Sequence, residues 1–402
     1  MTSKVKAQYI ITQGILYLIA PVASFIVSLR FYKNTISQVF FVLFAFYFGY
    51  QTDIFLDLNN HYNILLRQEQ LGFFRTLQDP ECLRFGMEPY HFILKEIVLF
   101  FSDSSRFFAG CAAAIYATMF LFFINQYKSF YAKHMLTTQF LAFLGMVFTV
   151  EYYWYTGVRY WTGAFFFLGF FSKYIVSNKK KYLYLACLCP LFHAAHLAII
   201  GAIFIYWLIG KRKILLYLTI VGSFAIRFLN DNIINIYHRL PFANLYIKPG
   251  YLDEKAQKAI KEQRTDFMRE QGNVIYQNRS YVLLFLLIII FIMLWNRNKH
   301  VFRGAYHRFY TFLLSLIPIV NISYADITAY ERIFKFFLVL CFSYLFLVLQ
   351  ERSNEWINKK FFINFVFALV ILFSILTAIV QEREYLFAPE VWFSNLYTMV
   401  IP

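Results

Sequence analysis

The sequence predicts an all-α protein, a polytopic transmembrane helix bundle of about 10–12 spans. The first observation is composition, because 60% of the 402 residues are hydrophobic and only 15% are charged. Soluble domains carry roughly a quarter of charged residues. The second is that apolar runs of about 15–22 residues, the length needed to cross a bilayer, recur along the whole chain. We therefore expect one integral membrane domain over residues 1–402.

Eleven runs are apolar enough to predict helices that enter the membrane. A weaker run, Tyr90–Phe101, is interrupted by Lys95 and Glu96. The eleven are Tyr9–Leu29, Ile36–Tyr50, Phe107–Asn125, Thr137–Tyr153, Tyr160–Ile175, Tyr182–Gly210, Ile214–Leu229, Tyr281–Trp295, Tyr306–Val320, Ile333–Gln350 and Phe361–Val380.

The charge distribution predicts which loops face the cytoplasm. Lys and Arg number 38 against 22 Asp and Glu, for a net charge of +16. The basic residues lie in short loops between apolar runs, which is typical of cytoplasmic loops and argues against nucleic acid as a partner. This assigns Lys173–Lys181, Lys211–Lys213, Arg297–Arg303 and Arg352–Lys360 to the cytoplasmic side.

The same rule places Asp231–Ser280 outside as one long extracytoplasmic loop, together with the turn near Tyr324–Tyr330. Within that loop, the charged stretch Leu252–Glu270 begins after Pro249 and Gly250 and predicts a surface helix. Such a helix is either a solvated cap or a lid over a polar substrate.

The run Tyr182–Gly210 does not fit one straight span, because basic clusters flank it on both sides. We expect two short helices or a re-entrant hairpin, broken between Pro190 and His196. The tip would carry Phe192, His193 and His196. Non-helical backbone within a membrane persists only where it is buried in protein or lines a wet cavity.

The first third of the chain allows two topologies. If Arg30 and Lys33 are cytoplasmic, the chain from Asp53 to Glu88 lies outside, and Tyr90–Phe101 lies in the interface or re-enters without crossing. If Tyr90–Phe101 crosses, everything before it inverts. We favour the first topology.

Arg159 is the strongest candidate functional residue. It lies between two apolar runs on the predicted outer face, near Glu151, with Gly157 and Gly163 on either side. An arginine fork there suits a phosphate or diphosphate, which it binds bidentately and without a metal. Tyr155 and Tyr160 are the substrate contacts expected beside it. The alternative is an arginine that only reaches towards lipid headgroups.

The histidines of the broken run form a second candidate. Cys189, His193 and His196 are spaced to share one helical face and could ligate zinc, although Pro190 disturbs the helix and no carboxylate is near. We favour no metal. His193 facing a cavity as a base, donor or phosphate partner competes with a packed, hydrogen-bonded histidine. His196 is a further predicted substrate contact.

Three acidic or basic residues elsewhere complete the candidate set. Asp53 leads out of the second run into a stretch rich in amides and aromatics, which suits sugar hydroxyls or is an ordinary loop. Glu88 opens the weak run and is either functional or a helix N-terminal acid. Arg332 is a second phosphate clamp or the partner of Glu331 or Asp326, and Tyr330 beside it is a predicted substrate contact.

Several catalytic motifs are missing from the sequence. It has no Walker A, dinucleotide-binding glycine pattern, HExxH, DxD run or GxSxG turn. This argues against an ATP-driven pump and a metal-dependent nucleotide-sugar transferase, and we expect no cofactor.

Together these segments resemble EpsG-type and Wzy-type polysaccharide polymerases. GVRYWTGAFFFLGFF, a lysine-rich turn and LCPLFHAAHLAIIGAIFIYWL are similar to the family's Gly-(Val/Ile)-Arg-Gln span, basic turn and Phe-His segment. GYQTD and MEPYHFIL are similar to its Asp-containing loop and Glu-Pro motif, and YERIFKFF to its later arginine-bearing span. The ordered set covers roughly Ile36 to Val348, although Tyr160 replaces the usual Gln.

The resemblance implies a metal-independent glycosyltransferase that polymerises oligosaccharide repeat units carried on polyprenyl (undecaprenyl) diphosphate. It would act at the outer face of a bacterial cytoplasmic membrane and make O-antigen, capsule or exopolysaccharide, with chain-length regulator and flippase proteins as expected partners. The phosphate-binding Arg carries over onto Arg159, the family His onto His193, and the acidic residues onto Asp53 and Glu88. Catalytic roles are thus expected for His193, Asp53 and Glu88, and diphosphate binding for Arg159 and Arg332. Glu151 is a further candidate for a catalytic role because it lies near Arg159 in the sequence. A membrane acyltransferase or ligase acting on glycans, and a lipid-linked glycan flippase or transporter, are the alternatives.

Overall fold

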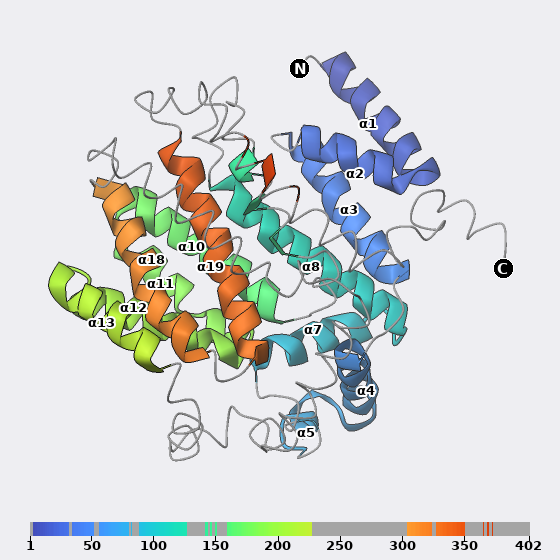
Figure 1. Ribbon diagram of the computed structural model, residues 1–402. Helices are drawn as coiled ribbons and strands as arrows, with labels where there is room; N and C mark the ends of the chain where they lie inside the picture. The colour runs from blue at the N-terminus through green and yellow to red at the C-terminus, as the bar shows by residue number, and fades with distance from the viewer. Residues whose placement is uncertain are drawn as a thin grey trace, which may run out of the picture.

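The protein is all-α, and every regular element in the described part of the chain is a helix (Figure 1). This confirms the predicted fold class. The computed structural model describes residues 3–31, 34–51, 56–79, 82, 88–126, 141–143, 145–146, 149–150, 159–226, 304–323, 327–349, 365, 368–369 and 372.

Three helices pack side by side: α3 (Thr35–Gln51), α8 (Ser105–Asn125) and α10 (Tyr160–Ser177). Each matches a predicted run to within about two residues at either end, because uniform apolar composition marks both limits. Helices α3 and α8 are antiparallel. Gln38 hydrogen-bonds Asn125 at one end of the pair, and Gly49 packs on Ala109 at the other.

Helix α10 runs parallel to α8. The Phe165 ring packs on Tyr116 near the start of the pair, and Phe170 packs on Phe122 further along. The first residues of α8 and α10 therefore lie at the same end of the bundle as the last residues of α3. We call this end the α7 end and the opposite one the lysine end.

Helices α18 (Gly304–Ser323) and α19 (Ile327–Val348) form an antiparallel hairpin against α10. Phe309 near the start of α18 packs on Tyr344 near the end of α19, and Phe167 of α10 packs on Phe336. Almost every described side chain of α19 beyond Arg332 is buried. Helix α19 begins at Ile327, six residues before the predicted start.

The predicted break inside Tyr182–Gly210 is confirmed. Helix α11 (Lys180–Ala186) runs back along α10, two 3-10 turns follow at η3 (Cys189–Leu191) and η4 (Ala194–His196), and α12 (Leu197–Ile209) leaves again. Pro190 lies in the first turn of η3, where its missing N–H removes no helical hydrogen bond. Helix α13 (Lys213–Ile226) then packs beside α18.

The prediction of one span over Tyr9–Leu29 is wrong. The structure has α1 (Ser3–Ile19) and α2 (Pro21–Arg30), which meet at an angle (Figure 1). Pro21 explains the break, because it lacks an N–H and its ring clashes with the preceding turn.

Between α3 and α8 the chain makes α4 (Leu56–Leu71), α5 (Phe73–Thr76) and α7 (Pro89–Leu99), which gather at the lower end of the bundle in Figure 1. Helix α3 ends and α8 begins at this same end. Helix α7 therefore does not run the length of the bundle. The favoured topology likewise has Tyr90–Phe101 enter the membrane region without crossing it. The loop expected after Asp53 is replaced from Leu56 onwards by helix α4.

Helix α7 mixes polar and apolar side chains on both of its faces. His91 and Lys95 are fully buried alongside Phe92, whereas Ile93 and Glu96 are exposed. This differs from an amphipathic helix in water, which buries its apolar side and exposes its polar side.

One described helix, α8, is long and apolar enough to cross a membrane. At about 1.5 Å per residue, its 21 residues reach roughly 30 Å. Four shorter apolar helices accompany it: Ala7–Ile19, Thr35–Gln51, Ala194–Ile209 and Lys213–Phe224. The predicted loop Asp231–Ser280 and run Tyr281–Trp295 lie outside the described residues, and Thr137–Tyr153 and Phe361–Val380 are described at scattered positions only.

Candidate functional site

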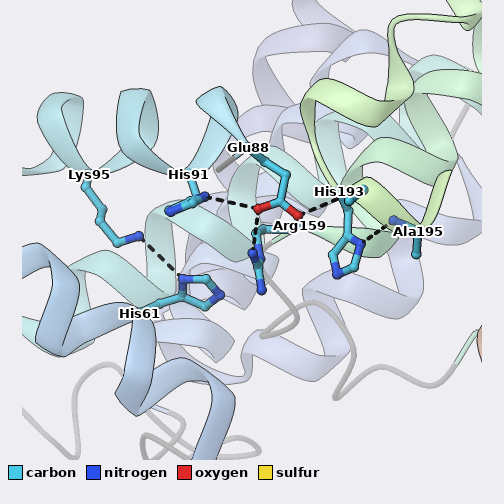
Figure 2. A network of polar contacts seen from close by, with 8 residues as sticks. His61, Glu88, His91, Lys95, Arg159, His193 and Ala195 are labelled. Carbon is cyan, nitrogen blue, oxygen red and sulfur yellow. Dashed lines mark hydrogen bonds and ion pairs between the residues drawn. The ribbon is translucent and has the colours of Figure 1, made fainter. Parts of the chain in front are cut away.

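A buried ion pair joins Arg159 and Glu88 at the α7 end. Arg159 precedes the first turn of α10, and Glu88 precedes Pro89 at the start of α7. The Arg159 Nη1 donates to Glu88 Oε2 over 2.9 Å, and each side chain is only 7% exposed (Figure 2). This pair ties the two helix starts together. Removing either partner would leave a buried charge uncompensated.

Glu88 also holds the broken hairpin. Its second oxygen, Oε1, accepts a hydrogen bond of 3.1 Å from the backbone N–H of Ala194, at the start of η4. Both carboxylate oxygens therefore have N–H partners, one from α10 and one from the hairpin. This arrangement suits a carboxylate that positions its neighbours better than one that removes a proton.

His193 lies at the hairpin tip, directly beside Glu88 (Figure 2). Its Nδ1 accepts a hydrogen bond of 3.0 Å from the backbone N–H of Ala195. The neutral ring consequently carries its proton on Nε2, since one nitrogen donates and the other accepts in that form. With Nδ1 engaged in this way, the donor hydrogen of the neutral His193 ring is the one on Nε2.

His196 links the hairpin to α10. It is fully buried, and its Nε2 lies 2.9 Å from the carbonyl oxygen of Tyr160, to which it donates. A Cβ on Gly163 would lie 2.5 Å from that Nε2 and 2.6 Å from Phe192 Cβ, so the hairpin reaches α10 only because residue 163 has no side chain. This position makes His196 a packing residue, and substrate contact is not supported for it.

Arg332 enters the same region from α19. The carbon at the centre of its guanidinium lies 5.5 Å from the centroid of the Tyr160 ring, within the range of a cation–π contact. The Tyr160 ring also lies 5.7 Å from the His193 ring and is itself buried. Tyr160 thus separates the second arginine from the hairpin histidines, while Tyr330 stacks on Phe334 along α19.

A second group of buried polar side chains lies behind Glu88, and the sequence analysis did not select it. The Lys95 Nζ is 3.4 Å from His61 Nδ1, and the rings of His61 and His91 are 5.5 Å apart. His91 Nδ1 lies 3.9 Å from Glu88 Oε2 (Figure 2). The group comes from α4 and α7, and all three side chains are buried.

Electrostatics keeps His91 neutral. Burial lowers the pKa of His91 well below its usual 6.5, and the positive charges of Lys95 and Arg159 lower it further, against a smaller raising contribution from the backbone of Glu88. At neutral pH the positive charge that contacts Glu88 is therefore that of Arg159 and not of His91.

The structure brings together three residues predicted to be functional, Glu88, Arg159 and His193, with Tyr160, His196 and Arg332 around them. The predicted Asp53, Glu151 and Tyr155 lie outside the described residues. The single helical face that zinc ligation by Cys189, His193 and His196 would need does not form, because η3 and η4 break it. Within the described ranges, no three His, Cys, Asp or Glu side chains converge as metal ligands.

Comparisons of the chain with protein-family models, with curated proteins and with solved structures found no match.

Proposed function

We propose that this protein is a multi-pass membrane glycosyltransferase that polymerises oligosaccharide repeat units carried on polyprenyl diphosphate. The observation that carries the proposal is the buried Arg159, held by Glu88 beside the tip of the broken hairpin, with Arg332 near it. A buried arginine and a half-buried one at the same end of an apolar bundle suit an anionic group presented at the membrane surface. The proposed location is the bacterial cytoplasmic membrane, with the site at its outer face.

Two features support a membrane location beyond α8. The first is helix α7, which exposes Ile93 and Ile97 while it buries His91 and Lys95. Exposed apolar side chains such as these are favourable against lipid and unfavourable against water. The second is the lysine end, where Lys179, Lys180 and Lys181 are all exposed. Exposed basic residues opposite the site agree with a cytoplasmic lysine end and an outer α7 end.

In the proposed reaction, a hydroxyl oxygen of one lipid-linked unit attacks the anomeric carbon of the glycan on another. A new C–O bond forms, the bond to the diphosphate oxygen breaks, and the diphosphate leaves with the electron pair. Arg159 and Arg332 stabilise the charge that develops on it. Glu88 accepts from one N–H of the Arg159 fork, which orients the guanidinium for the diphosphate.

The proton of the attacking hydroxyl must go to a base. Glu88 already accepts two hydrogen bonds, and the Nδ1 of His193 accepts one. We therefore assign the base to Asp53 or Glu151, and we assign His193, beside Glu88, to the contact with the phosphate or sugar. Both assignments name side chains whose roles can be tested by substitution.

The test measures the length distribution of lipid-linked and released glycan in a strain from which the gene has been deleted. The strain is complemented with wild type, Arg159→Ala, Arg159→Lys or Arg106→Ala. We expect long chains from wild type, single repeat units at the outer face from the deletion and Arg159→Ala, and little rescue by Lys, which lacks the fork. Arg106 is the control, an exposed arginine in the first turn of α8 at the same end.

Two outcomes would contradict the proposal. Single repeat units trapped on the cytoplasmic side would indicate a flippase. Full-length chains that lack only a substituent would indicate a transferase that modifies the glycan. In every arm, membrane levels of the protein must match wild type, so that loss of polymer reports on the site.

A further inference from the structure

A cavity of about 160 Å³ lies at the lysine end, far along the bundle from Arg159. It opens between α13 and α18. None of its lining side chains is acidic, and two can donate hydrogen bonds to an anion, the Lys213 ammonium and the His307 imidazole. The other lining residues are Gly210, Leu216, Tyr217, Tyr310, Thr311 and Leu314.

The local sequence explains why the cavity forms there. Helix α12 ends at Gly210, where a Cβ would lie 2.9 Å from Thr311 Cγ2, so the chain turns close against α18. Helix α13 begins three residues later, with Lys213 in its first turn. Asn321 of α18 hydrogen-bonds Ser223 further along α13, which keeps the two helices together.

The surroundings of the cavity are positively charged. Lys211 and Arg212 are exposed in the turn before α13, and Arg308 follows His307. Arg308 donates to the carbonyl oxygen of Ile175, at the end of α10. The first turns of α13 and α18 also meet here, and helix N-termini add a favourable field for an anion to that of the side chains.

Exposed apolar side chains lie on the face of α13 next to the one that lines the cavity. Ile214, Leu218 and Val221, spaced as one helical face, are 77%, 62% and 68% exposed. A cavity that contains Lys213 beside an exposed apolar face matches a molecule with a phosphate at one end and an acyl chain at the other.

We propose that this cavity binds a phosphate group, contacted by Lys213 and His307, and that the group is the headgroup phosphate of an anionic phospholipid whose acyl chain lies along Ile214, Leu218 and Val221. Inorganic phosphate would offer the same anionic oxygens without the chain. The site is separate from the Arg159 region, and it does not depend on the polymerase function.

The test uses the purified full-length protein in a neutral detergent. Phosphatidylglycerol, phosphatidylcholine or inorganic phosphate is titrated in, and binding is followed by native mass spectrometry and by the midpoint of thermal unfolding. We expect phosphatidylglycerol to bind and raise the midpoint, and phosphatidylcholine to do so much less. Lys213→Ala should weaken phosphatidylglycerol binding at least tenfold, and His307→Gln should weaken it less.

Lys180→Ala is the matched control, because Lys180 is an exposed lysine in the first turn of another helix at the same end. Selective phosphatidylglycerol binding that Lys213→Ala weakens and Lys180→Ala leaves intact supports the proposal. Saturable binding of inorganic phosphate that depends on Lys213 supports the phosphate site and overturns the lipid as its source. Equal binding of the two lipids, or equal losses in both lysine variants, overturns the site. If a variant fails to fold, the comparison of the two lipids on the wild-type protein still tests the proposal.

Discussion

The two ends of the bundle carry positive charge in opposite ways. At the α7 end, Arg159 and Lys95 are buried, and Arg159 is held by the carboxylate of Glu88. At the lysine end, Lys180 and Lys213 are exposed. Exposed cations are solvated wherever they occur, whereas buried cations are stable only with compensation from the rest of the fold. The exposed lysines therefore suit a role in orienting the chain, whereas the buried cations at the α7 end belong to the candidate site.

Glu88→Ala should produce the largest loss of stability, about 3–5 kcal/mol, because it leaves the Arg159 guanidinium buried without a carboxylate. The measurement is unfolding of the purified protein in detergent. Glu88→Gln should lose less, since the amide oxygen can still accept from Ala194. A loss in Glu88→Ala no greater than in an exposed lysine variant would remove the contrast between the two ends.

Gly163→Ala should destabilise the protein by roughly 1–3 kcal/mol, the usual effect of overpacking. The new Cβ would meet His196 and Phe192 at 2.5 and 2.6 Å, so the hairpin must move. Gly222→Ala in α13 is the matched control, because nothing lies within 4 Å of a Cβ there. The control should be neutral or stabilising by up to about 1 kcal/mol. Similar losses in both variants would show that the hairpin does not depend on this close approach.

His91 should make the stability of the α7 end depend on pH. Its pKa is below 6.5 in the folded protein, so between that pKa and 6.5 the unfolded chain binds more protons. Stability should therefore fall as pH decreases below about 6.5 and be unaffected by His91 above it. Thermal unfolding of wild type and His91→Gln across this range measures the difference, which should grow towards acid pH. Parallel profiles would mean that His91 binds its proton equally in the folded and the unfolded protein, so that burial does not lower its pKa.

Lys180→Ala should have the smallest effect, within about 0.5 kcal/mol of wild type, as is usual for a substitution at an exposed position. The same unfolding measurement checks it. A loss of several kcal/mol would show that the lysine end also depends on specific charge contacts.

Much of the helical framework could be predicted from the sequence alone. Helices α3, α8 and α10 follow runs whose composition changes sharply at both ends, and charge on both sides of Tyr182–Gly210 predicted the broken hairpin. The prediction of a single span over Tyr9–Leu29 failed because Pro21 divides that run into two helices. Helix α4 was missed because Asn59 and Asn60 resemble a loop, although Leu58, His61, Leu65 and Gln68 are spaced as one buried helical face.

The sequence predicted which residues belong to the candidate site, but it did not predict which of them contact one another. Arg159, His193 and Glu88 each stood out as polar groups beside apolar runs. Nothing in the sequence shows that Glu88 contacts Arg159, 71 positions away, and the hairpin at once, because both contacts depend on how α7 docks. A usable signal for His91 and Lys95 existed: the two lie four residues apart, on one side of a helix whose other side carries Ile93 and Ile97.

The broken hairpin has a consequence for biosynthesis. Helices α11 and α12 have 7 and 13 residues, and at 1.5 Å per residue they reach only about 10 and 20 Å. Neither alone matches the roughly 30 Å that a translocon-inserted segment must cover. If the protein lies in the membrane as proposed, the two halves must leave the translocon as a pair, after α10 is available to receive His196 beside Gly163. Assembly of this region would then follow the order of synthesis, and a chain halted before residue 196 would hold α10 without its partner.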